Sequence, residues 1–334
     1  MGQSPLPSLT SLGEFGLINS ISSLLGKKLG KEIIASIGDD AAVIKSTGRS
    51  ALVFTTDALV EGVHFDLRHD KPYDIGWKSI VASLSDIAAM NAKPVCAVVS
   101  IAIPKKISSA WIFSLYKGIS AAAKKYRCPI VGGDTTSSCS GIFISVALLG
   151  AADRKNITLR SSAKPGDLVC VTNDLGRAYA ALKILQTADH KRTPPSVLLL
   201  KHAHPTPQFD ILKKLRKASV NIHSMIDISD GLSAELNHIA KHSGVLIEID
   251  EDSIPIHPSV MQYARILGED ATPWALQSGE EYELLFTASP QYRKKLSSIS
   301  GITLIGEVKK GKGVLMRTRQ GKRIKLSLTG YTHF

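Results

Sequence analysis

The chain has 334 residues, of which 44% are hydrophobic and 21% are charged, a composition typical of a folded globular protein. This length exceeds that of one ordinary domain and predicts two, which we place at residues 1–150 and 151–334. No apolar run approaches the ~18 residues that cross a bilayer, and the N-terminus lacks the basic start and apolar core of a signal peptide. We therefore expect a cytoplasmic protein with no membrane partner.

The formal net charge is +12, and the basic residues are dispersed along the chain. Such a charge can indicate a nucleic-acid-binding protein. Aromatic residues make up only 6% of the chain, however, and no helix-turn-helix, zinc-finger or aromatic RNA-binding motif is present. A positive field that attracts anionic substrates explains the charge equally well, so we expect no nucleic-acid partner. The four cysteines form no close pair, which favours buried reduced thiols over zinc ligands or disulfides.

The first half of the chain alternates between helical and strand-like patterns. In chain order these are a helix over 14–25, a strand over 51–54, a helix opened by Pro72, a strand over 95–103 that is apolar on both faces, a helix capped by Ser108 that runs to about 126, and strands over 130–131 and 142–149. The alternation predicts an α/β or α+β domain.

The turn-rich segment 160–167 separates the two halves. Beyond it, strands are predicted over 168–172, 225–226, 245–249, 282–286, 303–308, 314–317 and 324–326, and helices over 175–185, around 197–217 and over 232–241. The second half is therefore also mixed α/β.

Four segments place acidic, hydroxyl or glycine residues directly after an apolar, strand-like run. They are 37–43 (IGDDAAV), 54–57 (FTTD), 130–136 (IVGGDTT) and 225–231 (MIDISDG). Each also fits a simple turn or helix N-cap. Strand ends with this chemistry usually meet at one end of a sheet, so we expect the four segments to converge. Because adjacent carboxylates repel each other, the convergence predicts a site for cations such as Mg²⁺ that accompany phosphates.

Other acidic and histidine residues leave alternatives open. Asp86 ends an apolar helix face, where a solvated carboxylate and a metal ligand are even alternatives. His238 and His242 lie one helical turn apart, and solvent-facing side chains are favoured over a metal pair because no carboxylate or cysteine follows nearby. His64 is placed to contact a substrate. The segment around Glu280 forms either a loop or a ligand contact.

Several common nucleotide and hydrolase motifs are missing. The chain has no G-x-x-x-x-G-K-[ST] loop, no protein-kinase motif set and no serine-hydrolase elbow. An enzyme that uses nucleotides must therefore have another scaffold.

In combination, these motifs resemble the thiamine-monophosphate kinase family. That family belongs to a superfamily of ATP-using enzymes with aminoimidazole ribonucleotide synthetase and selenophosphate synthetase. The resemblance spans 13–334 and is carried by segments 37–43, 55–65, 84–90, 131–136, 163–167, 226–232 and 279–284. Each motif alone is weak, but their order and separations make the resemblance specific.

The resemblance implies a fold, an activity and partners. The fold is a two-domain α/β (α+β) aminoimidazole ribonucleotide synthetase-like fold, with an N-terminal domain that contributes to a β-barrel shared by a homodimer and a C-terminal α/β domain. The implied activity is phosphorylation of thiamine monophosphate to thiamine diphosphate, with ATP as co-substrate and several Mg²⁺ ions. Another ATP-dependent enzyme of the superfamily, acting on a different small substrate, is the alternative.

The resemblance also implies roles for individual residues. Metal ligands match Asp40, Thr55, Thr56, Asp57, Asp86, Asp134, Asp227 and Asp230. ATP contacts match Tyr116, Gly133, Asp134, Arg160 and Ser229. Substrate contacts match His64, Glu280 and an aromatic position that is Leu328 here. No general base is expected, because a phosphate monoester with a second pKa near ~6 is already ionised near neutral pH.

The chain departs from the family pattern at a few positions, namely Ser83, Ser278, Leu328 and Thr332. Loss of an aromatic side chain at 328 removes a stacking surface for a thiamine ring, worth about 1 kcal/mol. This departure concerns affinity for thiamine and leaves the phosphoryl-transfer residues in place.

Overall fold

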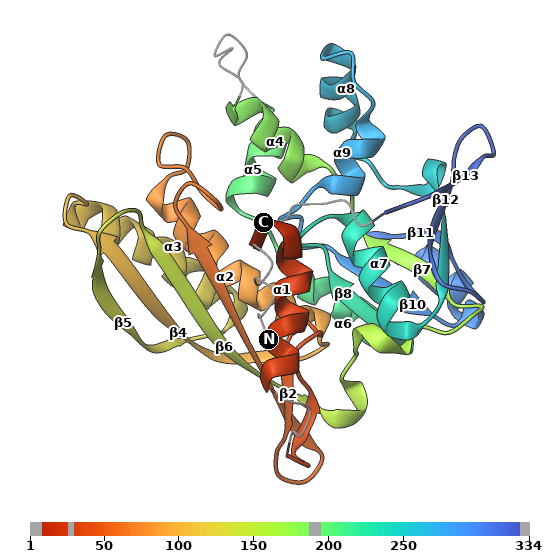
Figure 1. The fold of residues 1–334 in the computed structure, drawn as a ribbon, viewed down its shortest axis with the longest axis horizontal. Helices are drawn as coiled ribbons and strands as arrows, with labels where there is room; N and C mark the ends of the chain where they lie inside the picture. Colours follow the sequence, from red (N-terminus) through yellow and green to blue (C-terminus); the bar gives the residue numbers. More distant parts are fainter. Residues whose placement is uncertain (1–8, 26–29, 187–194, 328–334) are drawn as a thin grey trace, which may run out of the picture.

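The computed structural model describes residues 9–25, 30–186 and 195–327, so Leu328 and Thr332 lie outside the described residues. Two sheets lie side by side with helices packed against them (Figure 1). The fold is mixed α/β, as expected from the sequence. No helix of the described segments is long and apolar enough to cross a membrane.

The first sheet has six strands in the order β1-β2-β3-β6-β4-β5. Their bounds are β1 Ile33–Ala35, β2 Ala42–Lys45, β3 Ser50–Val60, β4 Lys93–Pro104, β5 Ile130–Ser138 and β6 Phe143–Asp153. Neighbouring strands are antiparallel except for the parallel pair β4 and β5. Within the described residues the sheet has two edges, β1 and β5, and is not closed into a barrel.

Two helices cover one face of this sheet. Helix α2 (Pro72–Ala89) starts at a proline, and α3 (Ser109–Tyr126) starts after Ser108, whose hydroxyl accepts from the Trp111 N–H at 3.2 Å. The first core lies between them and the sheet. The described residues leave the opposite face open, and its exposed residues include Phe54, Val98 and Phe143.

The second sheet has seven strands in the order β13-β12-β9-β11-β7-β10-β8. Their bounds are β7 Leu168–Thr172, β8 Ile222–Asp227, β9 Leu246–Asp250, β10 Leu284–Ala288, β11 Ile302–Lys309, β12 Gly313–Arg317 and β13 Arg323–Lys325. Alternate side chains of β7 enter two different cores, with Val169 and Val171 in one and Leu168 and Cys170 in the other. The sheet is therefore covered on both faces.

The described residues form eight further α-helices. Their bounds are α1 Leu9–Leu25, α4 Arg177–Gln186, α5 Ser196–Ala203, α6 Phe209–Lys217, α7 Leu232–Ser243, α8 Pro258–Ile266, α9 Ala271–Gln277 and α10 Arg293–Ser298. Helix α7 packs in the core with Val169, and α6 and α10 pack in the core with Leu168. Helices α4, α5, α8 and α9 share a fourth core beside the sheet.

The structure corrects several expectations from the sequence. The strands predicted over 51–54 and 130–131 continue through the acidic motifs, because β3 runs to Val60 and β5 to Ser138. Thr is a good strand former, and the glycines of β5 lie in an edge strand. The strand over 95–103 is covered on one face, by the core that holds Ala97, Val99 and Ile101, and Val98 is exposed on the other. Strand β6 runs to Asp153, beyond the strand end predicted at residue 149. Cys139 is exposed, whereas Cys128 and Cys170 are buried.

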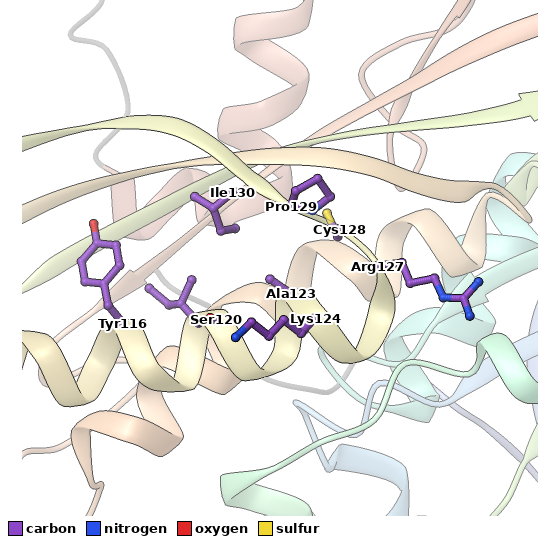
Figure 2. Close-up of a pocket in the computed structure, with 9 residues that line it drawn as sticks. Tyr116, Ser120, Ala123, Lys124, Arg127, Cys128, Pro129 and Ile130 are labelled. Carbon is purple, nitrogen blue, oxygen red and sulfur yellow. The ribbon is translucent and has the colours of Figure 1, made fainter.

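A cavity of about 520 Å³ lies between α3 and the start of β5. Figure 2 shows its lining, which includes Tyr116, Lys124 and Ile130.

At the centre of β5, a Cβ added to Gly133 would lie 1.8 Å from the Val99 carbonyl oxygen. Only glycine allows β5 to approach β4 this closely.

Helices α2 and α3 touch through two glycines. A Cβ added to Gly118 would lie 1.9 Å from the Tyr73 carbonyl oxygen, and one added to Gly76 would lie 2.0 Å from that of Leu115. We expect Gly118→Ala to lower the free energy of unfolding by at least about 2 kcal/mol, because two helix backbones must separate. The control Gly30→Ala, with no atom within 4 Å of its added Cβ, should change it by less than about 0.5 kcal/mol. Denaturant unfolding measures both, and equal effects would contradict the close helix contact.

Candidate active site

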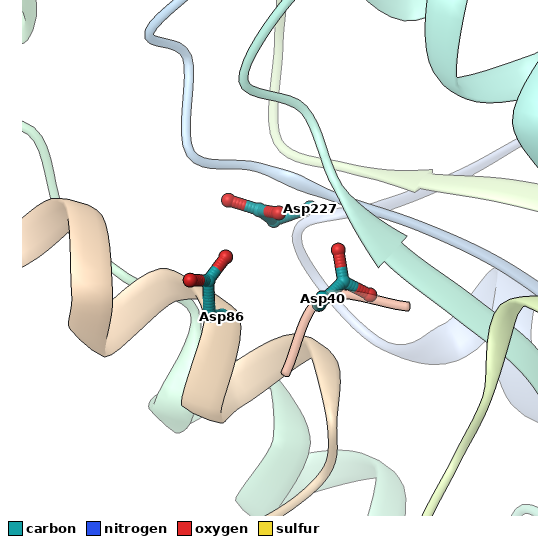
Figure 3. A group of neighbouring side chains, drawn as sticks. All are labelled: Asp40, Asp86 and Asp227. Atoms are coloured by element: carbon teal, nitrogen blue, oxygen red, sulfur yellow. The ribbon is translucent and has the colours of Figure 1, made fainter. Parts of the chain in front are cut away.

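Three carboxylates from distant parts of the sequence meet at one point. Asp40 lies in the loop before β2, Asp86 in the last turn of α2, and Asp227 at the end of β8. Figure 3 shows the three side chains facing one another, and each offers a carboxylate oxygen within 4.8 Å of the others. Of the four segments expected to converge, 37–43 and 225–231 meet here through Asp40 and Asp227, and Asp86 of α2 joins them.

Hydroxyl groups fix the orientation of the carboxylates. The Ser85 hydroxyl donates to Asp227 Oδ2 at 2.6 Å, and the Thr55 hydroxyl donates to Asp86 Oδ2. A neighbouring carboxylate, Asp57, accepts from the Ser83 hydroxyl at 2.6 Å. Ser83 and Ser85 both belong to the buried face of α2. The helix that carries Asp86 thus also orients the carboxylates on two other strands.

Arg160 is the cation that contacts the cluster. It begins a short 3₁₀ turn, and its Nη2 lies 2.5 Å from Asp40 Oδ1. Its backbone N–H also donates to Asp39 Oδ1 at 3.3 Å. The other oxygen of Asp40, Oδ2, is buried without a hydrogen-bond partner within the described chain. An unpartnered buried carboxylate oxygen is costly, and it fits coordination to a cation.

The pKa values of the cluster show the effect of burial and mutual repulsion. Burial, followed by the charge of Asp40, raises the pKa of Asp227 to about 8. Burial and the nearby charges of Asp57 and Asp227 raise the pKa of Asp86 well above its ordinary value. Burial also raises the pKa of Asp57, and burial with the Asp40 charge raises that of Asp39 to about 6. A divalent cation would stabilise the ionised forms, so this oxygen-only donor set fits Mg²⁺.

The predicted metal ligands Thr56 and Asp134 are not brought to this cluster within one chain. Successive strand side chains point to opposite faces, and Thr55 and Asp57 point toward α2. Thr56 is exposed on the open face, with its hydroxyl 3.5 Å from Ser145 Oγ. Asp134 is exposed on β5 in the same cross-strand row as Ser145. Strand β5 is three strands from β3, a separation of roughly 14 Å.

The loop after β8 places two further predicted residues. The Asp230 N–H donates to Glu235 Oε1 at 3.1 Å, and the Ser229 carbonyl accepts from the Glu280 N–H at 2.7 Å. Glu235 of α7 was not predicted from the sequence. It is buried, and burial raises its pKa well above its ordinary value. The one available signal was the position of Glu235 in the first turn of the helix that follows Asp227 and Asp230.

The predicted substrate contacts His64 and Glu280 share one partner. The Lys78 ammonium donates to the His64 carbonyl at 2.7 Å and to Glu280 Oε2 at 2.9 Å. Next to Glu280, the Tyr282 side chain is buried in the core of the first domain. Burial, then the charges of Glu280 and Asp57, raise the pKa of Tyr282 well above its ordinary value. Sequence reasoning missed Lys78, because nothing local distinguishes it from an exposed lysine on a helix, and Tyr282, because it was assigned to the start of a strand.

The acidic residues after Glu280 form a structural network. Lys201 of α5 is buried and lies 2.5 Å from Glu283 Oε1 and 3.7 Å from Glu281 Oε2. Glu281 Oε1 accepts from the Gly176 and Ala178 N–H groups at 2.8 and 3.1 Å, at the start of α4. These contacts fix the loop that precedes β10.

The two histidines of α7 differ in burial. His238 is buried rather than solvent-facing, and burial and the charge of Arg160 lower its pKa to about 3. His242 is exposed as expected, and its Nδ1–H donates to the His238 carbonyl at 2.8 Å. The expectation for His238 was wrong because α7 is covered on its His238 side by the Arg160 turn.

Two family models match the chain, those of the AIR synthase related protein N-terminal domain over residues 38–152 and C-terminal domain over residues 164–317. The thiamine-monophosphate kinase of Aquifex aeolicus is 35% identical to the chain and covers 98% of it and 99% of its own length. The chain belongs to the thiamine-monophosphate kinase family. This confirms the resemblance found in the motifs. The family member of Bacillus subtilis is 33% identical, with 97% of this chain and 100% of that protein covered.

Solved structures extend the similarity of this family member to the fold. The structure of AaThiL complexed with AMPPCP and TMP has a TM-score of 0.88 and 35% identity, and covers 99% of this chain and 100% of that one. The hydrogenase maturation protein HypE in complex with ATP has a TM-score of 0.70 at 20% identity over 88% of this chain and 89% of that one. HypE therefore shares the fold.

Removal of divalent cations should make the stability of this protein depend on Asp227. Its pKa is about 8 when folded against 3.8 ordinarily, so the folded state holds a proton that the unfolded state releases. Stability is therefore lost as pH rises from about 4 to about 8. In EDTA at pH 8 we expect Asp227→Asn to raise Tm by roughly 2–4 °C, and less at pH 5.

The control for this experiment is Asp252→Asn, whose side chain is 73% exposed. It should show no such pH-dependent difference. Adding Mg²⁺ should raise the Tm of the unaltered protein more than that of Asp227→Asn. Scanning calorimetry gives all of these values, and a lower Tm for Asp227→Asn in EDTA at pH 8 would contradict a destabilising carboxylate cluster.

Proposed function

We propose that this protein catalyses ATP-dependent phosphorylation of thiamine monophosphate to thiamine diphosphate, assisted by several Mg²⁺ ions. The observation that carries the proposal is the cluster of Asp40, Asp86 and Asp227, with its unpartnered Asp40 oxygen, in a chain of this family. We place the enzyme in the cytoplasm.

The side chains of this cluster prepare a site for phosphates. Asp40, Asp86 and Asp227 would hold the divalent ions, with Asp57 beside them, and Ser85 and Thr55 keep the carboxylates oriented. When bound, Mg²⁺ would neutralise the negative charges that make the two phosphate groups repel each other. The acceptor phosphate is ionised near neutral pH, so the chain needs no general base. Its task is to position ATP and thiamine monophosphate in line. His64 and Glu280 would hold the acceptor, thiamine monophosphate.

The cavity under β5 supports a nucleotide site. Tyr116 offers an aromatic face at this cavity, and Lys124 on its rim offers positive charge. We assign Tyr116, Gly133, Asp134, Arg160 and Ser229 as ATP contacts. Gly133 allows close backbone approach, and Arg160 is already oriented by Asp40.

The open face of the first sheet supports a homodimer. Among the described residues β5 is an edge strand paired only with β4, and apolar residues such as Phe54, Val98 and Phe143 are exposed on neighbouring strands of the same sheet. An exposed strand edge and an apolar sheet face favour association with another sheet. We propose that the N-terminal domains, residues 1–150, of two copies form a shared β-barrel that covers this face, with residues 151–334 as the α/β domain beside it. This arrangement would also change the surroundings of Thr56 and Asp134.

The activity is tested by ADP release with Mg²⁺, with and without thiamine monophosphate. We expect release that depends on thiamine monophosphate and is abolished by EDTA. Asp86→Asn should lower kcat/KM at least about 100-fold, because a lost metal ligand costs several kcal/mol of transition-state stabilisation. The exposed control Asp252→Asn should retain the activity. ADP release only with another small acceptor would instead favour a different enzyme of the superfamily, and none with any acceptor would contradict the proposal.

The homodimer is tested by sedimentation. We expect a dimer that Val98→Lys converts to monomer, because a charge is then buried in an apolar interface. The matched control is Leu182→Lys on α4, since Leu182 is 42% exposed and Val98 is 37% exposed. The control should stay dimeric. A monomeric unaltered protein, or a Val98→Lys dimer of unchanged affinity, would argue against the shared barrel.

A further inference from the structure

Lys78 is a buried cation between the two loops that carry the proposed acceptor contacts. It lies in the second turn of α2, and only 3% of its side chain is exposed. Its ammonium donates to the His64 carbonyl at 2.7 Å and to Glu280 Oε2 at 2.9 Å. His64 belongs to the first domain and Glu280 to the second. One ammonium group therefore joins the two domains at this point.

The backbone around Glu280 is fixed, but its carboxylate depends on Lys78. Glu280 has a left-handed φ of 55°, and its N–H donates to the Ser229 carbonyl at 2.7 Å. A Cβ added to Gly279 would lie 2.8 Å from the same carbonyl oxygen. These contacts hold the main chain of the loop. Within the part of the chain that the structure describes, Lys78 is the one hydrogen-bond partner of the carboxylate, which leaves Oε1 for a donor on the ligand.

His64 is held through its backbone and through its ring, and its N–H donates to the Val60 carbonyl at 3.0 Å. Its carbonyl accepts from Lys78, and its ring Nδ1 accepts from the Val60 N–H at 3.1 Å. The Lys78 contact ties the loop to α2, and the ring contact fixes the orientation of the ring. The loop and the ring are therefore fixed before a ligand arrives.

We propose that Lys78 is a positioning residue that sets the affinity for the phosphorylated acceptor by fixing His64 and Glu280 relative to each other. The inference rests on the proposed function, because it takes both residues as acceptor contacts. Lys78 and Asp86 are eight residues apart on one helix, roughly 12 Å along its axis. The same rigid helix therefore fixes the acceptor end and the metal end of the site, and Lys78 affects the first of these.

The test measures KM for each substrate separately, together with acceptor binding by calorimetry without ATP. In Lys78→Met we expect KM and Kd for thiamine monophosphate to rise at least tenfold, while KM for ATP changes less than twofold. A double-mutant cycle combines Lys78→Met with Glu280→Gln. The rise in KM for thiamine monophosphate in the double variant should be at least threefold smaller than the product of the rises in the two single variants, because Lys78 acts partly through Glu280. The control Lys309→Met removes another lysine–glutamate pair, with Glu248, and should change neither KM.

Lys78→Arg carries the same test where Lys78→Met is not recovered folded. The longer, planar guanidinium keeps the charge but cannot match the ammonium geometry in so closed a space, so KM for thiamine monophosphate should rise at least threefold. Unchanged acceptor affinity in the folded variant, equal rises for both substrates, or strictly multiplicative effects would overturn the positioning role. Failure of the unaltered protein to phosphorylate thiamine monophosphate would instead overturn the proposed function.

Discussion

Mutual repulsion among buried carboxylates is the constraint on which the site depends. Asp40, Asp86 and Asp227 approach one another closely, and Asp57 lies near enough to raise the pKa of Asp86. Arg160 compensates one of these charges. Burial favours the protonated forms of the others. A bound cation would therefore stabilise the ionised cluster relative to the cluster without one. The hydroxyl donors on α2 and β3 hold the carboxylates in place until such ions arrive.

Helix α2 is the element through which this constraint acts on the whole fold. Its middle packs in the first core through Ile80 and Leu84, and its end packs in a core of the second domain through Ala88 and Ala89. The serine between these two regions, Ser85, contacts Asp227 on the second sheet. A helix buried on nearly all sides cannot shift without disturbing both domains. The relative position of the two sheets and the geometry of the site are therefore determined together.

The order and type of most elements could be predicted from the sequence, because apolar periodicity and caps such as Pro72 and Ser108 are local signals. The meeting of Asp40 and Asp227 could be expected from their chemistry, although their distance could not, whereas the residues around Asp86 left a solvated carboxylate and a metal ligand as even alternatives. The assumption that every motif ends a strand was wrong for Asp57 and Asp134, which lie within β3 and β5. Strand interiors and strand ends share residue types when the strand is at an edge or faces a functional site.

The residues that reasoning from the sequence missed have roles that arise only from tertiary contacts. Lys78 and Lys201 are buried lysines. The partner of Lys78, Glu280, is 202 residues away in the sequence, and the partner of Lys201, Glu283, is 82 residues away. Nothing local distinguishes them from exposed lysines on a helix. For the segment that contains Glu281, a loop and a ligand contact were both open, and Glu281 accepts hydrogen bonds from the start of α4. Single sequences carry no signal for such long-range pairs.

The charge of the chain and the charge of the site have opposite signs, and this difference has a consequence for binding. The net charge of +12 attracts anionic phosphates over a range set by the Debye length, about 8 Å at physiological ionic strength. The carboxylate cluster repels the same phosphates at contact distance. Under the proposed function, cations held by Asp40, Asp86 and Asp227 would reverse the local sign, so that long-range attraction and short-range binding would agree. The net positive charge would then serve encounter, and the acidic centre would select phosphates that arrive with their metal ions.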